Sequence, residues 1–440
     1  MIEPVDGDVA DIKLGLSEED WTKLTKEVNV IFHVAATVRF DETLKKATLI
    51  NVRGTREALE LGKQCNNLKC FNHTSTAFAH ATVSRINSDV EEKFYPSPVP
   101  PDVMIELVET VHEDKLNAIT PSLIEGWPNT YTFTKALAEE LIRTSAGDMP
   151  VCIVKPPVVL NSLVEPAPGW IDVNAAMSSP SGAVLGIGLG LVHLILSDRE
   201  NIVSYAPVDY VNNAIITASW DSTQRNKTGS KEIPVYTVST SRYGTKWNIF
   251  SEGLRSDEVL RLVSPKTVWY CGAVETRSTR LFWLLTWLFH YIPGYLIDAL
   301  LHVSGAKPKG LPSLVNIYTK LYKMSMLYHY FTFNYWNIRD DNLRGMIERM
   351  SAQDRAIYNC DVTTIDYREL IKTMCIGMRK YIVKDELKGS VEGYKRQLYL
   401  FKYANIALCT IYAYLIYLVL YFVYFVLNSI VHILIGILPC

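Results

Sequence analysis

The chain has 440 residues, which is enough for two or three domains with a sizeable hydrophobic core. Lysine and arginine nearly balance aspartate and glutamate, and the formal net charge is −2. This balance excludes the strongly basic surface of a nucleic-acid-binding protein, so we expect no nucleic-acid partner. The eight cysteines show no Cys-x-x-Cys spacing, which predicts reduced thiols and no metal site.

The first part of the chain alternates between predicted strands and helices. Residues 28–36 (VNVIFHVAA) form a continuous apolar run, which is typical of a strand buried on both faces of a parallel sheet. Residues 47–65 predict a helix, residues 68–78 a second strand and residues 151–154 a third. Strands that alternate with crossover helices indicate a doubly wound α/β sheet, in which ligands bind beyond the carboxyl ends of the strands.

A predicted helix over residues 129–142 carries Tyr131 and Lys135 four positions apart on one face. A lysine ammonium beside a phenol lowers the pKa of the phenol, which makes the tyrosine a usable proton donor near neutral pH. In isolation an ordinary amphipathic helix explains the spacing better, because a chain with 25 tyrosines contains it by chance about once. Ala35-Ala36, Ser75-Thr76 and Pro156, however, all fall at the carboxyl ends of predicted strands, and this convergence favours a catalytic pair.

The second half of the chain carries fewer chemical signals. Residues 182–191 are rich in glycine, but they lack a preceding strand and a P-loop lysine, so we interpret them as close packing or as a flexible wall of a binding site. Residues 207–220 predict a helix and residues 233–239 one more strand. Asp361 and Asp366 are paired acidic residues without a nearby histidine or cysteine pattern, so we expect solvated or helix-capping roles.

Two apolar stretches indicate contact with a membrane. Residues 406–427 are long enough to cross a bilayer, and no charged side chain follows Lys402. Basic residues precede this stretch, so the positive-inside rule places the body of the protein in the cytosol. Residues 281–301 are apolar nearly all round but are broken at Pro293-Gly294, which predicts two short halves. They form either a buried hairpin or, as we prefer, a membrane-dipping element or the wall of an apolar tunnel.

Seven stretches together resemble the alcohol-forming fatty acyl-CoA reductases, a group of extended short-chain dehydrogenases/reductases. The stretches are Gly7-Asp8-Val9, residues 33–40 (HVAATVRF), residues 51–55 (NVRGT), residues 75–78 (STAF), residues 128–135 (PNTYTFTK), Val154-Lys155-Pro156 and residues 165–172 (EPAPGWID). The resemblance spans nearly the whole chain. It implies an incomplete doubly wound Rossmann-like sheet in residues 1–245, a mainly helical domain in residues 246–402 and a transmembrane anchor in residues 403–440.

The resemblance also implies roles for individual residues. Thr76, with Ser75 beside it, is expected to polarise the substrate carbonyl, and Tyr131 to donate the proton. Lys135 is expected to hold the nicotinamide ribose and to lower the pKa of the tyrosine. The remaining cofactor contacts implied by the family are Asp8 and Val9 near the adenine, Ala35 and Ala36 in the cleft, and Pro156 and Val158 against the nicotinamide.

The implied reaction is reduction of a long-chain fatty acyl-CoA to a fatty alcohol with NADPH. The implied location is a membrane of the endoplasmic reticulum or peroxisome, with contacts through residues 406–427 and 281–301. Two alternatives stay open: a membrane-bound reductase acting on another lipid such as a sterol, and a non-catalytic acyl-binding relative.

The sequence departs from the family pattern in two places. Lys155-Pro156-Pro157 stands where the family usually has Arg-Pro-Ser. Residues 1–27 contain no Gly-rich turn for the cofactor pyrophosphate, so we expect a chain that begins in the strand before Asp8 and lacks the first βαβ unit. On this interpretation residues 28–36 form an unpaired or apolar edge, and residues 1–440 alone form a poor enzyme.

Overall fold

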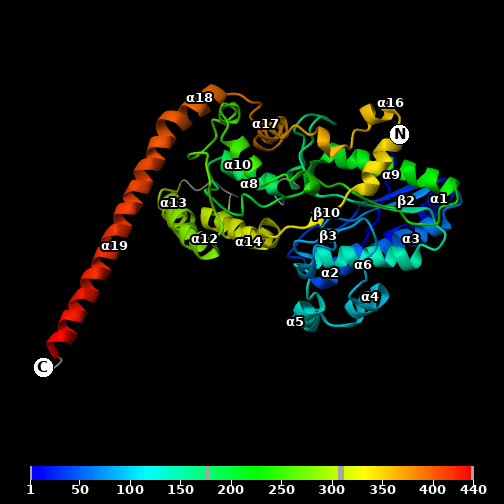
Figure 1. Ribbon diagram of the computed structural model, residues 1–440, viewed down its shortest axis with the longest axis horizontal. Coiled ribbons are helices and arrows are strands. Elements are labelled where there is room, and N and C mark those ends of the chain that lie inside the picture. The colour runs from blue at the N-terminus through cyan, green and yellow to red at the C-terminus, as the bar shows by residue number, and fades with distance from the viewer. Residues whose placement is uncertain (1, 175–178, 306–311, 438–440) are drawn as a thin grey trace.

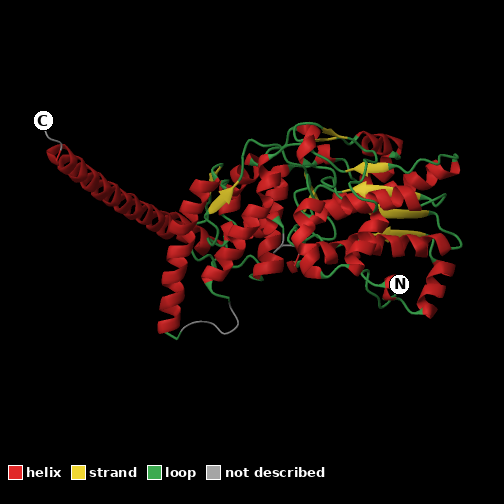
Figure 2. Ribbon diagram, turned by 90° about the horizontal axis from the view of Figure 1, so that it is seen from below, coloured by secondary structure: helices red, strands yellow, loops and turns green. Residues whose placement is uncertain are grey.

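The computed structural model describes residues 2–174, 179–305 and 312–437. A mixed α/β body carries the N-terminal part of the chain at one end, and a single long helix projects from the other end (Figure 1). The strands of the central sheet lie together at the end of the molecule opposite this helix (Figure 2). The fold class is therefore α/β with a helical C-terminal region, as the sequence predicts.

The central sheet has four parallel strands in the order β1-β2-β4-β8. Their bounds are β1 Val30–His33, β2 Cys70–Thr74, β4 Val151–Lys155 and β8 Val235–Thr237. Helices α3 (Gly54–Gln64) and α6 (Thr130–Ser145) pack together on one face, while α9 (Val208–Lys227) contacts β2 and β4 on the other. This is the crossover arrangement expected of strands that alternate with helices.

Strand β1 corrects the expectation of a strand buried on both faces. It pairs with β2 at the edge of the sheet, and its Val30 and Phe32 side chains are 38% and 46% exposed. Ile31 packs on the core that holds α3 and α6, whereas α9 contacts β2 and β4 and leaves the opposite face of β1 open. The apolar edge that the sequence also predicts is therefore present.

The other elements surround this sheet. Three two-stranded parallel pairs are β3 (Asp89–Val90) with β10 (Asn337–Ile338), β5 (Val158–Leu160) with β7 (Tyr205–Pro207), and β6 (Leu194–Leu196) with β9 (Val274–Thr276). The remaining helices of the first part are α1 (Glu18–Glu27), α2 (Leu44–Thr48), the π-helical segment η2 (Leu49–Arg53), α4 (Pro101–Thr110) and α5 (Glu113–Leu123). Short 3-10 turns are η1 (Ile12–Gly15), η3 (Val83–Arg85), η4 (Ser241–Tyr243) and η6 (Val362–Thr364).

The second part of the chain is mainly helical. Its helices are α8 (Pro180–Gly188), α10 (Asn248–Leu254), α11 (Asp257–Leu260), α12 (Thr279–Thr286), η5 (Trp287–Tyr291), α13 (Ile292–Val303), α14 (Leu314–Phe333), α15 (Asp341–Arg349), α16 (Ala352–Ile357), α17 (Tyr367–Gly377), η7 (Met378–Val383), α18 (Ser390–Lys395), η8 (Arg396–Phe401) and α19 (Lys402–Ile437). Asp361 and Asp366 cap η6 and α17 with their side chains, as expected. One core joins Val154 of the sheet to Met346 and Met374 of this part.

The stretch around Pro293 is not broken into two halves. Helices α12 and α13 are joined by the π-helical segment η5, so that residues 279–303 form one continuous helix. The π turn ends where the Ile292 N–H donates to the Trp287 carbonyl, immediately before the proline that cannot donate. Gly294 lets the Tyr318 ring of α14 approach, because an added Cβ would lie 3.1 Å from that ring.

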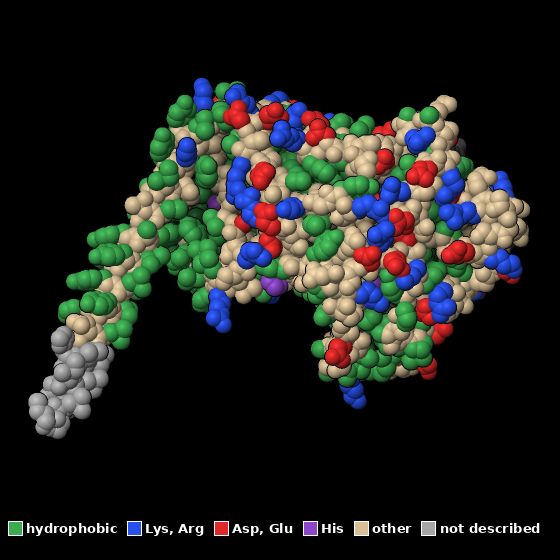
Figure 3. Space-filling view, viewed as in Figure 1, with side chains coloured by type: hydrophobic (Ala, Val, Ile, Leu, Met, Phe, Trp, Pro, Cys, Tyr) green, Lys and Arg blue, Asp and Glu red, His purple; other side chains and the backbone are tan. Residues whose placement is uncertain are grey.

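Helix α19 is the second apolar helix, and it runs through Asn428-Ser429 without a break. Its 36 residues extend over about 54 Å at about 1.5 Å per residue. Both residues 279–303 and the helix that contains α19 are long and apolar enough to cross a membrane. Hydrophobic side chains cover the visible face of α19 and extend onto the neighbouring part of the body (Figure 3).

Candidate active site

The carboxyl ends of β2 and β4 bring the predicted polar residues together. The Ser75 N–H donates to the Val154 carbonyl at 2.8 Å, and the Ala77 N–H donates to the Pro156 carbonyl at 2.8 Å. These bonds extend the parallel pairing past the strand ends and hold Ser75 and Thr76 beside Pro156. Ser75 and Thr76 are nearly buried, at 4% and 5% exposure.

Helix α6 places Tyr131 at the same edge. Asn129 starts the helix with an extended backbone, and its side-chain oxygen accepts the Thr132 N–H at 2.9 Å. Tyr131 therefore lies in the first turn, where its ring stacks on Phe40 with centroids 5.8 Å apart. The Tyr131 phenol also interacts with the Thr76 hydroxyl. The Thr76 hydroxyl thus lies beside the Tyr131 phenol, and these are the two groups to which the family resemblance gives carbonyl polarisation and proton donation.

Lys135 does not lower the pKa of Tyr131 as expected. Burial raises the pKa of Tyr131 to about 12, and the Thr76 hydroxyl is the group that opposes this rise. The Lys135 ammonium donates to the Thr74 carbonyl at 2.9 Å, which fixes it to the end of β2. Burial lowers the pKa of Lys135 to about 8, although Glu139 opposes the change. Tyr131 is accordingly a neutral phenol at physiological pH, able to donate its proton.

A buried charged cluster lies behind these residues. The Glu139 carboxylate accepts the Ser75 hydroxyl at 2.5 Å, contacts His80 Nε2 at 3.1 Å and pairs with Lys155 Nζ at 2.8 Å. Burial by itself would raise the pKa of Glu139, but Lys155 and His80 outweigh it and hold the pKa at about 2. The sequence reasoning missed Glu139, although its position four residues after Lys135 on the same helical face was a usable signal.

Two histidines line the adjoining strands. His33 of β1 and His73 of β2 are neighbours in register, with ring centroids 5.4 Å apart. Burial lowers the pKa of both, to about 3 for His33, so both rings are neutral at physiological pH. His33 Nε2 contacts the Thr55 hydroxyl at 3.0 Å, while the fully buried His73 has no hydrogen-bond partner for either ring nitrogen among the described residues.

The predicted cofactor residues occupy two regions. Ala35 and Ala36 follow β1, Ala35 exposed and Ala36 half-buried. Val158 begins β5 immediately after the Pro156 turn. Residues 2–8 form no strand, which corrects the expected strand before Asp8.

Asp8 and Val9 lie against the start of α3. The Asp8 carboxylate accepts the Ala10 N–H at 2.8 Å. A Cβ on Gly54 would lie only 2.6 Å from the Val9 carbonyl oxygen. Glycine at this position therefore permits close contact between the two backbone segments. The exposed Ala35 after β1 and the Lys135 ammonium at the end of β2 are the groups at this edge that could contact a dinucleotide.

Comparisons with known proteins agree with this geometry. Residues 1–215 match the NAD-binding family model described as male sterility protein, and residues 289–385 match the Sterile model of the same description. The reductase domain of a nonribosomal peptide synthetase from Mycobacterium tuberculosis has a similar fold, with a TM-score of 0.52, 17% identity, and coverage of 85% of this chain and 74% of that one. The terminal reductase domain of the myxalamid pathway has a TM-score of 0.51 at 17% identity, with coverage of 87% and 76%.

The fold and the site thus define a Rossmann-like oxidoreductase that uses a nicotinamide cofactor. Among curated relatives, the Drosophila melanogaster fatty acyl-CoA reductase wat is 34% identical over 89% of this chain and 73% of its own length. The human fatty acyl-CoA reductase 1 is 32% identical over 88% of this chain and 72% of its own length. The chain belongs to the fatty acyl-CoA reductase family.

Proposed function

We propose that this protein reduces long-chain fatty acyl-CoA to fatty alcohol with NADPH. The observation that carries the proposal is the contact of Tyr131 with Thr76 at the carboxyl edge of β2, in a chain whose curated relatives are named fatty acyl-CoA reductases. A phenol and a hydroxyl that converge on one point can both donate to a single carbonyl oxygen. Such preorganised donors stabilise the negative charge that develops there.

The reaction would comprise two hydride transfers, and NADPH, when bound, would supply both hydrides. In the first, the thioester carbonyl carbon would gain a hydride, its bond to sulfur would break, and CoA would leave as a thiolate that takes a proton from solvent. In the second, the aldehyde carbon gains a hydride and its oxygen takes the proton of Tyr131. Thr76 holds the carbonyl oxygen in both steps, with Ser75 beside it.

Lys135 and the predicted cofactor residues would position the dinucleotide. Lys135 would hold the ribose next to the nicotinamide, while Ala35 and Ala36 line the cleft and Pro156 and Val158 pack against the ring. Asp8 and Val9 would bind near the adenine. Glu139 would act through Ser75 and Lys155 as a positioning residue, because it orients the Ser75 hydroxyl and balances the buried cations.

We also propose a division of roles along the chain. Residues 1–245 would hold the cofactor and the reacting groups, residues 246–402 the acyl chain, and residues 403–440 the membrane anchor. The basic residues before α19 support a body on the cytosolic side of the membrane, which we propose to be that of the endoplasmic reticulum or of peroxisomes. Protease added to intact organelles should digest the body and spare α19, and a protected body would contradict this orientation.

Replacing Tyr131 by phenylalanine tests the reaction. The change keeps the ring that stacks on Phe40 but removes the acidic proton, so turnover should fall by about 10²–10⁴, while NADPH binding stays unchanged. Tyr210→Phe is the matched control, because that hydroxyl contacts Thr364 and lies outside the proposed catalytic set. Wild-type turnover in Tyr131→Phe would disprove the assignment of the proton donor.

A further inference from the structure

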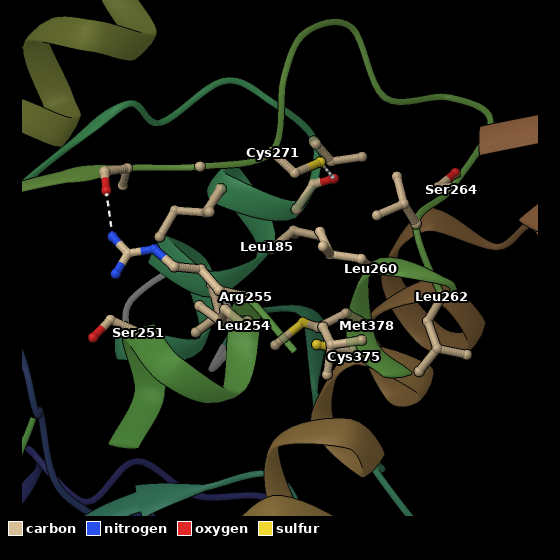
Figure 4. A pocket seen from close by; sticks show the side chains of 18 of the residues that line it. Leu185, Ser251, Leu254, Arg255, Leu260, Leu262, Ser264, Cys271, Cys375 and Met378 are labelled. Carbon is tan, nitrogen blue, oxygen red and sulfur yellow. Dashed lines mark hydrogen bonds between the residues drawn. The ribbon is translucent and has the colours of Figure 1, made fainter. Parts of the chain in front are cut away.

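An apolar pocket lies between α8, α10, α11 and α17, in the helical part of the molecule (Figure 4). Its empty volume is about 790 Å³, part of which is open to solvent. Leu185, Leu260 and Met378 point into it from three different helical elements. The reaction proposed above uses none of these residues.

The polar groups around the pocket are already engaged. The Arg379 guanidinium is buried and pairs with Asp385 at 2.9 Å, and it also donates to the Leu262 and Lys388 carbonyls. Arg255 lies at the rim, half exposed, and donates to the Ala273 carbonyl at 3.0 Å. An occupant that reaches the interior therefore meets few free hydrogen-bonding groups, which favours a hydrocarbon.

Two cysteines in the wall behave as small apolar side chains. Burial raises the pKa of both Cys271 and Cys375 to about 12, so both thiols stay protonated at physiological pH. Cys271 Sγ lies 3.0 Å from the Gly188 carbonyl, which satisfies its weak donor. The wall thus offers no thiolate for metal binding or nucleophilic attack.

The same wall is joined to the base of α19. The Cys271 N–H donates to the Gln397 side-chain oxygen at 2.8 Å, and Gln397 donates back to the Trp269 carbonyl at 3.0 Å. Trp269 Nε1 donates to Asn405 at 3.2 Å in the first turns of α19. A few residues later β9 ends at Thr276, and α12 begins at Thr279. Both apolar helices therefore leave the body next to this pocket.

We propose that the pocket binds the hydrocarbon chain of the fatty acyl thioester, and that the chain reaches it from the membrane beside the base of α19. The inference rests on the proposed reductase function and adds the location of the acyl chain. It commits to one occupant because the pocket is apolar within and lies next to the points where the two candidate membrane helices leave the body. A water-soluble ligand would need polar partners that this interior has already engaged.

Photolabelling locates the chain without requiring turnover. The full chain in phosphatidylcholine liposomes is irradiated with a palmitoyl-CoA analogue that carries a diazirine at the end of its acyl chain. The labelled peptides, identified by mass spectrometry, should fall within residues 184–195, 251–275 and 375–383. Excess palmitoyl-CoA should prevent labelling, whereas octanoyl-CoA should not, because its short chain buries fewer methylenes.

A substitution that fills the pocket provides a second test of the proposal. Ala273→Trp places an indole against the pocket, while Val268→Trp adds the same group at a side chain that is 57% exposed outside it. Ala273→Trp should reduce labelling by about tenfold or more, the equivalent of about two buried methylenes, and Val268→Trp should not. The KM for palmitoyl-CoA should rise in parallel, with that for octanoyl-CoA unchanged.

The outcomes separate the two proposals. Label confined to other peptides in an enzyme that still reduces palmitoyl-CoA would overturn the acyl pocket and leave the reductase function standing. Label in the pocket without any alcohol formation would support the pocket and contradict the reaction. Because the wild-type labelling map is decisive by itself, misfolding of Ala273→Trp would not remove the test.

Discussion

Replacing Glu139 by glutamine tests the buried charged cluster behind Tyr131 most sharply. The change keeps the side-chain shape and one oxygen for the Ser75 hydroxyl, but it removes the charge that faces Lys155 at 2.8 Å. Both side chains of this ion pair are at most 3% exposed. The Lys155 cation would therefore remain buried without its counter-ion, which is the costly way to break a pair.

Two independent arguments give the same loss of folding free energy for Glu139→Gln. Removal of one partner of a buried ion pair costs about 3–5 kcal/mol. Independently, a carboxyl whose pKa is about 2 in the folded chain and 4.5 when unperturbed contributes about 3 kcal/mol. Because the folded pKa of Glu139 is lowered, this stability is present above pH 4.5 and is lost as the pH falls towards 2.

The assay is urea unfolding in detergent micelles, followed by tryptophan fluorescence. Glu139→Gln should lower the free energy of unfolding by about 3 kcal/mol, and a second change, Lys155→Met, should restore most of it by removing the unpaired cation. Glu140→Gln is the matched control, because its partner Arg143 is half exposed and surface pairs contribute at most about 1 kcal/mol. A loss below about 1 kcal/mol in Glu139→Gln would refute the reasoning.

Three further predictions concern Lys135, Gly169 and the two apolar helices. The kcat/KM for reduction should fall above about pH 8, where Lys135 loses its proton. Glu139→Gln should move this decline to lower pH, because it removes the negative charge that stabilises the Lys135 ammonium. A flat profile up to pH 10 would contradict the role of Lys135. Gly169→Ala should lower the Tm, because its Cβ would lie 2.3 Å from the Thr373 carbonyl and the backbone φ there is +75°. Gly147→Ala, at a φ of +59° with no neighbouring atom within reach, should lower the Tm less. Equal decreases in the two variants would exclude an effect of the Thr373 contact. A chain that ends at Lys402 should become extractable from membranes by carbonate, yet it should still bind vesicles through the exposed apolar face of α13. Complete loss of vesicle binding would assign all membrane contact to α19.

Local patterns in the sequence predicted the parts of the site that depend on neighbouring residues. The apolar runs located β2 and β4, and the geometry of parallel strands then required Ser75 and Pro156 to meet at one edge. The helix that starts after Asn129 brought Tyr131 to the same place. The convergence of Tyr131 and Thr76 was therefore predictable from the order and spacing of the residues alone.

Features that depend on distant contacts were not predictable in the same way. The role of Glu139 appears only when Lys155 from β4 and His80 from the turn after β2 meet one side chain. The exposure of one face of β1 depends on where α9 packs, and its edge position depends on which strands pair with it; its apolar run reports neither. The break predicted at Pro293 failed because a π-helical turn accommodates the proline and keeps α12 and α13 in one helix.

Product analysis tests the central claim most directly. Residues 1–27 contain no Gly-rich pyrophosphate turn, so we expect slow turnover from residues 1–440. The chain, reconstituted in liposomes with saturating NADPH and palmitoyl-CoA, should nevertheless release alcohol and free CoA thiol in equal amounts, with two NADPH oxidised for each alcohol. Tyr131→Phe should reduce all three rates by about 10²–10⁴. Alcohol formation by Tyr131→Phe at the wild-type rate, or NADPH oxidation without alcohol in the unaltered chain, would contradict the account.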